Sequence, residues 1–136
     1  MDWVLDASLA LAWALPDELS VRAEEFLKET WGKGSFWVPA LWWYELSNGL
    51  VMAQRKYRVS EADRNRLMEI YGVLPIQTDV FVSAELAWRL QAIAQEYSLT
   101  CYDATYLELA QRRGLGLATT DQSLAMAARK AGITVF

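Results

Sequence analysis

Histidine is absent from the 136 residues of the sequence, and cysteine occurs only once, at Cys101. Without an imidazole, the chain cannot build a histidine-dependent nucleophilic triad or use histidine as a general acid or base. It also cannot form an intramolecular disulfide or a zinc site made of histidine or clustered cysteine. The chemistry left at neutral pH is mainly that of carboxylates, which bind hard ions such as Mg²⁺ or Mn²⁺.

We expect neither a secretory leader nor a membrane span in this sequence. Met1-Asp2-Trp3 opens with an acid and no basic segment, and the single cysteine fits a reducing compartment, so we expect a cytoplasmic protein. The most apolar stretch, 34–54, contains Pro39 and Glu45 near its middle. These two residues favour a strand, a turn and a buried helix over a membrane span.

Basic side chains are fewer than acidic ones, with 13 Lys and Arg against 17 Asp and Glu and a net charge of −4. This balance argues against binding nucleic acid through overall charge, but it leaves room for a local basic patch. One candidate patch is Arg55, Lys56 and Arg58. Contacts to RNA phosphates and an ordinary solvated helix end are both open for these residues.

Short apolar runs alternate with longer segments of helical pattern along the chain. The runs predict five strands, at 3–5, 36–38, 74–76, 115–119 and 133–135. Helices are predicted at 8–15, 18–31, 39–57, 60–72, 79–97, 100–113 and 122–131. Because the strands are short and apolar with little polar alternation, we predict an α/β fold of one domain, 1–136. Its parallel sheet of about five short strands is flanked by helices on both faces.

Residues that begin or end helices support these boundaries. Ser60 and Asp63 have the spacing of a capping box, and Thr100 stands in the same relation to Asp103. The remaining signals are Pro16 as the stop of the first helix, Thr78 or Asp79 as the cap of the fifth, and Gly114 after the sixth.

Four acidic residues stand at positions that neither a core role nor a surface role explains well. Asp6 ends the first predicted strand and Asp121 follows the fourth. Ligands bind beyond the carboxyl ends of the strands in open parallel α/β sheets, so these two acids should face one crevice. Glu45 and Asp103 lie in the first turns of helices that begin near the same edge.

Each acid also has a purely structural explanation. Asp6 or Asp121 could be a helix N-cap, and Asp103 could belong to a capping box with Thr100. Glu45 lies among apolar residues and cannot be buried cheaply without a partner. Its neighbour at i+3, Asn48, could supply one hydrogen bond either as that partner or as support for a bound ion.

One shared site accounts for all four acids more economically than four separate roles. Carboxylates within a few ångströms of one another repel, so at least one of them would take up a proton unless a cation were present. A divalent ion removes this conflict. Hydroxyl groups of Ser8, Thr119 and Thr120 could then hold the carboxylates or the waters around the ion.

Four segments carry a resemblance to a known family: Val4-Leu5-Asp6-Ala7-Ser8, Val38-Pro39 with Glu45 and Asn48, Tyr102-Asp103-Ala104 with Leu107 and Ala110, and Thr119-x-Asp121. Together they resemble the PIN domain, in particular the VapC-type toxins of bacterial and archaeal toxin–antitoxin pairs, over essentially the whole chain. The resemblance implies a Mg²⁺- or Mn²⁺-dependent ribonuclease whose acidic cluster is Asp6, Glu45, Asp103 and Asp121. It also implies an RNA substrate, a cognate antitoxin protein and a homodimer.

The implied reaction is hydrolysis of RNA by water, which leaves 5′-phosphate and 3′-hydroxyl ends. Two alternatives stay open. Asp6 could be the nucleophile of a phosphoryl-transfer enzyme that forms an aspartyl phosphate. The chain could also be a non-catalytic α/β interaction module whose acids only cap helices. Neither alternative accounts for Glu45.

Overall fold

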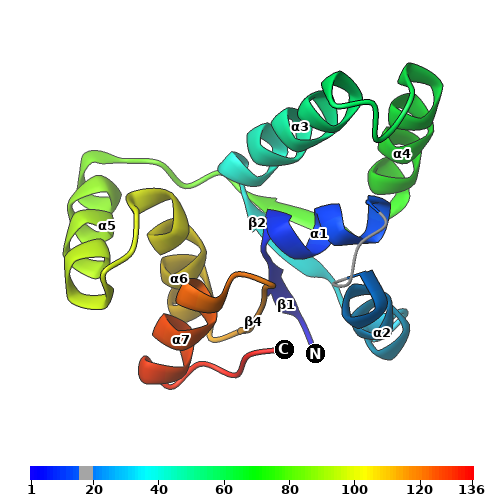
Figure 1. The fold of residues 1–136 in the computed structure, drawn as a ribbon. Helices are drawn as coiled ribbons and strands as arrows, with labels where there is room; N and C mark the ends of the chain where they lie inside the picture. Colours follow the sequence, from blue (N-terminus) through cyan, green and yellow to red (C-terminus); the bar gives the residue numbers. More distant parts are fainter. Residues whose placement is uncertain (16–19) are drawn as a thin grey trace.

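A parallel sheet of four strands lies at the centre of the computed structural model, which describes residues 1–15 and 20–136 (Figure 1). The strands are β1 (Trp3–Leu5), β2 (Phe36–Pro39), β3 (Ile76–Asp79) and β4 (Gly116–Ala118), in the order β3-β2-β1-β4. The chain therefore moves outward from β1 to β3 and then returns to place β4 on the other side of β1. Ligands in sheets of this kind bind where the order reverses, which here is between β1 and β4.

Helices cover both faces of the sheet, as expected for parallel strands joined by helical crossovers. Figure 1 shows one group on the right of the sheet: α1 (Ala7–Ala14), α2 (Ser20–Thr30), α3 (Ala40–Arg55) and α4 (Glu61–Val73). The group on the left is α5 (Ala84–Tyr97), α6 (Cys101–Arg113) and α7 (Gln122–Lys130). The apolar stretch 34–54 forms β2 and α3, and no helix in the described residues is long and apolar enough to cross a membrane.

The α/β fold with a parallel sheet is confirmed, while two strands differ from the prediction. The segment predicted at 133–135 makes only an isolated parallel bridge between Val135 and Leu117. The third strand begins at Ile76 and not at Leu74. Pro75 has no N–H to donate and only its carbonyl oxygen pairs, accepting from the N–H of Phe36, so the hydrogen-bonded ladder starts one residue later.

Several predicted helix ends are also confirmed. Ser60 and Asp63 form a reciprocal capping box, and the Thr100 hydroxyl accepts from the N–H of Asp103. Gly114 ends α6 in the left-handed conformation, with φ of 66°. The predicted stop at Pro16 and the predicted start at position 18 lie outside the described residues.

The predicted cap of α5 is wrong. Thr78 and Asp79 belong to β3, and the helix begins five residues beyond Asp79, where the hydroxyl of Ser83 accepts from the N–H of Leu86. The Asp79 carboxylate is instead an acceptor for Arg112 on α6. This contact between distant parts of the chain outweighs the local capping preference.

The core lies where the two helix groups meet the sheet. Its largest fully buried side chains include Trp42, Tyr106, Phe26 and Phe36. The Tyr71 hydroxyl donates to the carbonyl oxygen of Ala10 at 2.6 Å, which ties α4 to α1. Most of the stabilising free energy therefore comes from burial of aromatic and aliphatic side chains against a small sheet.

A buried ion network joins α6 to the end of β3. Arg112 donates two hydrogen bonds to Asp79, at 2.7 and 3.1 Å, and its Nε donates to Glu108 at 2.8 Å. Both carboxylates are nearly inaccessible, and Arg112 holds the pKa of Asp79 below its usual range. Removing the guanidinium would leave Asp79 with only the longer contact to Arg113 at 3.4 Å and Glu108 with only Arg89 at 3.2 Å, so two buried carboxylates would lose their main partner.

We predict that Arg112→Ala lowers the free energy of unfolding by about 3 kcal/mol because Asp79 and Glu108 lose their common partner. Urea unfolding at pH 7 measures this change. Arg66→Ala is the matched control, because Arg66 pairs with Asp63 on the surface and its loss should cost less than about 0.5 kcal/mol. Equal stabilities of the two variants would contradict the assignment of this network.

Candidate active site

Asp6 and Thr119 lie side by side at the carboxyl edge of the sheet, at the point where the strand order reverses. Leu5 and Ala118 are register partners in the neighbouring strands β1 and β4. Asp6 follows Leu5 directly in the sequence, and Thr119 follows Ala118. The N–H of Asp6 donates to the carbonyl oxygen of Ala118 at 2.9 Å. The parallel register thus brings two residues that are far apart in sequence into contact.

Two hydroxyl groups hold the Asp6 carboxylate. Ser8 and Thr119 both donate to its Oδ2, each at 2.6 Å. Asp6 occupies the N-cap position of α1, but its side chain accepts no N–H of that helix, so the capping explanation is wrong for this residue. Burial raises the pKa of Asp6 although both hydroxyl groups favour the charged form, and the charge of Asp121 adds to the rise.

Three residues were predicted to support the site with their hydroxyl groups. Two of them do so, and the third contributes its backbone N–H. Ser8 and Thr119 bind Asp6 directly and lie 3.3 Å from each other. Thr120 takes part through its backbone, because its N–H donates to the Ser8 hydroxyl. Thr119 also accepts from the N–H of Asp121, so one side chain links two of the four acids.

Glu45 lies on α3 and receives a hydrogen bond from the hydroxyl of Tyr106 on α6. Burial raises the pKa of Glu45, and the charges of Asp6 and Asp103 raise it further. Asn48, the predicted partner, is exposed, and the described hydrogen bond to Glu45 comes from Tyr106 instead. Sequence reasoning missed Tyr106, although its position at i+3 from Asp103 places it on the same side of α6.

Asp103 and Asp121 complete the group. Asp121 does cap α7, because its Oδ1 accepts from the N–H of Leu124 at 3.0 Å. Burial raises the pKa of Asp103, and the charges of Asp121 and Asp6 contribute to the rise. Four carboxylates from four different elements therefore repel one another at one edge of the sheet.

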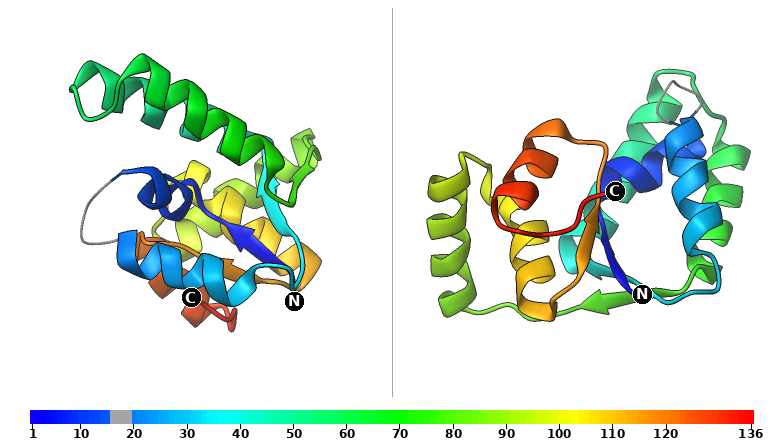
Figure 2. Two further views of the ribbon diagram at one scale, coloured as in Figure 1. Left: turned by 90° about the vertical axis from the view of Figure 1, so that its right-hand side faces the viewer. Right: turned by 90° about the horizontal axis from the view of Figure 1, so that it is seen from below.

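Within the described part of the chain, no ion pair joins a basic side chain to any of these four acids. The arginines of that part form their ion pairs elsewhere, with Asp63, Asp79 and Glu108. Arg55, Lys56 and Arg58 are exposed at the outer end of the α3–α4 hairpin, which extends beyond the sheet (Figure 2). Ten residues of α3 separate Arg55 from Glu45, a distance of about 15 Å along the helix axis.

The donor set fits a divalent ion by its chemistry. Carboxylate and hydroxyl oxygens are hard ligands. Burial and then mutual repulsion raise the pKa values of three of the acids, and an ion would relieve the repulsion. Within residues 1–15 and 20–136, however, no three such side chains stand as a ready group of metal ligands. Binding an ion would therefore require side-chain rotation or bridging waters.

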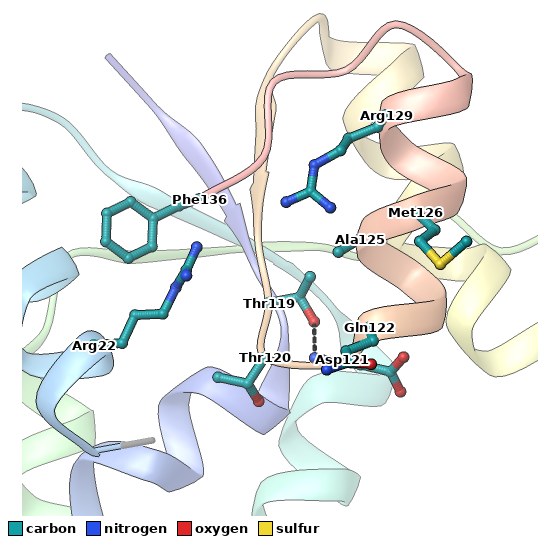
Figure 3. Close-up of a pocket in the computed structure, with 9 residues that line it drawn as sticks. All are labelled: Arg22, Thr119, Thr120, Asp121, Gln122, Ala125, Met126, Arg129 and Phe136. Atoms are coloured by element: carbon teal, nitrogen blue, oxygen red, sulfur yellow. Dashed lines mark hydrogen bonds between the residues drawn. The ribbon is translucent and has the colours of Figure 1, made fainter. Parts of the chain in front are cut away.

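A cavity of about 380 Å³ opens beside this edge (Figure 3). Thr119, Thr120 and Asp121 form the part of its wall nearest the acids. Arg22 and Arg129 lie on the rest of the wall, together with Phe136. Asp121 is the one of the four acids that lines the cavity, and Thr119, which holds Asp6, lines it too.

Comparisons with known proteins identify the family of this chain. Residues 3–130 match the PIN domain family. Ribonuclease VapC3 of Pyrobaculum aerophilum is 30% identical over 125 residues, which is 92% of this chain and 93% of that protein.

Solved structures share the fold. The crystal structure of PAE2754 from Pyrobaculum aerophilum has a TM-score of 0.70 at 25% identity, over 99% of this chain and 83% of that one. VapBC2 from Rickettsia felis, solved bound to a DNA fragment from its promoter, has a TM-score of 0.71 at 11% identity, over 100% and 98% of the chains.

We predict that the metal-free protein becomes more stable as the pH falls from 8 to 5. The pKa values of Asp6, Glu45 and Asp103 are raised in the folded state, so protons bind the folded chain more tightly than the unfolded chain. The lowered pKa of Asp79 acts in the opposite direction, but only at lower pH. Thermal melts in EDTA across this range test the prediction.

Asp6→Asn provides the control for this effect. Asparagine keeps the size and an acceptor oxygen but removes the charge, so at pH 8 the variant should melt above the unmodified protein. It should also show a weaker dependence on pH. A variant that melts lower and keeps the full pH dependence would show that the repulsion inferred here is absent.

Proposed function

This chain belongs to the PIN domain family, and on that premise we propose that it is a ribonuclease acting as the toxin of a VapBC-type toxin–antitoxin pair. The observation that carries the proposal is the group of four acids at the point where the strand order reverses. Asp121 caps a helix, but Asp6 and Glu45 do not, so a non-catalytic module does not account for them. Asp6 is only 5% exposed, which disfavours its use as the nucleophile of a phosphoryl-transfer enzyme.

The reaction is hydrolysis of a phosphodiester bond in RNA. Water adds to phosphorus, the 3′-oxygen leaves with a proton, and the products carry 5′-phosphate and 3′-hydroxyl ends. A divalent ion bound by Asp6, Glu45, Asp103 and Asp121 would supply positive charge next to the phosphate and would lower the pKa of the attacking water. The chain needs no histidine for this chemistry, in agreement with its composition.

The residues of the chain position and hold the charges of the site. Ser8 and Thr119 fix Asp6, and Tyr106 from the opposite helix group fixes Glu45, so both carboxylates keep a defined orientation. Burial and the neighbouring carboxylates raise the pKa of Tyr106, which keeps its hydroxyl group protonated as a donor. Asp103 and Asp121 complete the proposed ligand group for Mg²⁺ or Mn²⁺.

An antitoxin protein and a second copy of the chain are the proposed partners, and the cytoplasm is the proposed location because the substrate is RNA. The surface offers apolar residues to such partners. Val80 and Val82 in the loop before α5 are 76% and 81% exposed, and Trp88 on α5 is 79% exposed. Exposed apolar side chains that lie close together are typical of protein interfaces.

We predict that Asp6→Asn and Asp103→Asn each reduce metal-dependent RNA cleavage by several orders of magnitude, because the charge that holds the ion is lost. Single-turnover cleavage of a panel of structured and unstructured RNAs, in Mg²⁺ and in Mn²⁺, measures the loss. Asp63→Asn is the matched control, since the amide oxygen of asparagine can still accept from the N–H of Ser60 in the capping box and Asp63 lies outside the site.

Metal binding provides a readout that does not depend on cleavage. At a Mn²⁺ concentration 100 times the dissociation constant, the unmodified protein should gain about 2.7 kcal/mol of stability, and the two site variants should gain less. Circular dichroism confirms that each variant is folded. Folded site variants that cut RNA as fast as Asp63→Asn would refute the proposed nuclease site.

The homodimer has a separate test. We predict a mass of twice 15.5 kDa by light scattering, because a dimer would cover apolar surface that the single chain leaves exposed. Trp88→Glu should shift the mass toward that of one chain if α5 belongs to the interface. A mass of 15.5 kDa for the unmodified protein at high concentration would remove the homodimer from the proposal.

A further inference from the structure

We propose that Arg22 and Arg129 bind a phosphate group of the RNA backbone next to the phosphate that is hydrolysed. This inference rests on the proposed function and adds the residues that align the substrate. The cavity beside the acids carries it, because its wall has two chemically different parts. One part is shared with the acidic site, and the other is basic.

The two arginines reach the cavity from opposite groups of helices. Arg22 lies on α2 and Arg129 in the last turn of α7, and both line the same space. Figure 3 shows the two side chains turned toward one another across the cavity, while the carboxylate of Asp121 points away from them. An anion between the two arginines would therefore have a guanidinium group on each side and would not face the Asp121 carboxylate.

The surroundings of each arginine favour a phosphate ligand. Both residues are exposed, so solvent-borne RNA can reach them. The guanidinium carbon of Arg22 lies 5.2 Å from the centre of the Phe136 ring, a contact that restrains the side chain. A planar guanidinium group can donate two parallel hydrogen bonds to phosphate oxygens.

The charge of the whole molecule makes a local contact of this kind necessary. With a net charge of −4, the chain as a whole repels RNA, and the acids at the site add to the repulsion. A basic group adjacent to Thr119, Thr120 and Asp121 offsets the repulsion where the backbone must enter. Arg55, Lys56 and Arg58 lie at the tip of the α3–α4 hairpin and cannot act at this position.

A general preference for cations at helix C-termini explains why α7 ends in Arg129 and Lys130, but it does not explain their directions. Arg129 lines the cavity next to the acids, whereas Lys130 lines a different depression with Ser98 and Ser123. The two residues therefore form a matched pair for an experiment. Arg22 and Lys28 form a second pair on α2.

Fluorescence anisotropy tests the proposal with a labelled, randomised single-stranded RNA of about 20 nucleotides, in EDTA so that cleavage does not contribute. Arg22→Gln and Arg129→Gln should each weaken binding about tenfold, as expected for a charge-assisted hydrogen bond. Each should also reduce the slope of log affinity against log salt concentration by about 1. Lys28→Gln, Lys130→Gln and Arg55→Gln should change the affinity less than about twofold.

Several results would overturn the proposal. Arginine variants that bind RNA as tightly as the lysine controls would do so. A loss of affinity in Arg55→Gln equal to that of the arginine variants would do so too. Arginine variants that lose affinity only for an antitoxin would assign the cavity to a protein partner. If the unmodified protein still cleaves RNA in Mn²⁺ in these cases, the proposed function stands. An unmodified protein that neither binds nor cleaves RNA would overturn both.

Discussion

The buried carboxylate of Asp6 is the constraint on which the site depends. A charged group this deep needs hydrogen-bond donors; Ser8 supplies one from the first turn of α1, and Thr119 supplies the other from the residue after β4. The register between β1 and β4 is therefore also a requirement of the site. A shift of one residue would turn Thr119 to the opposite face and leave Asp6 without one of its partners.

The sequence predicted the parts of the site that follow from strand ends and local spacing. Asp6, Ser8 and Thr119 come together as expected because parallel strands end at a common edge. Tyr106 was missed because the residue that binds Glu45 is 61 positions away, and local spacing offered Asn48 instead. Where a nearby and a distant partner compete for a buried carboxylate, the packing of the helices decides which of the two binds it.

Competition between nearby and distant partners also explains which parts of the fold could not be predicted. Capping signals of helices were correct wherever no distant residue competed for the side chain, as at Ser60 and Thr100. Asp79 has an equally suitable local sequence, yet Arg112 takes its carboxylate, and α5 begins later at Ser83. The last predicted strand is reduced to a bridge at Val135, which lies at the edge of a sheet where pairing is available on one side only.

Helix α6 connects the unfavourable charges of the site to a favourable ion network. Its first two turns carry Asp103 and Tyr106 at the acidic edge, and its last turns carry Glu108 and Arg112. The bonds from Arg112 to Asp79 anchor the far end of the helix to β3. Because the helix is one rigid element, this anchor also sets where Tyr106 meets Glu45. The fold thus tolerates the repulsion among the acids, because the stabilising ion network of α6 lies only one or two helical turns from the acidic edge.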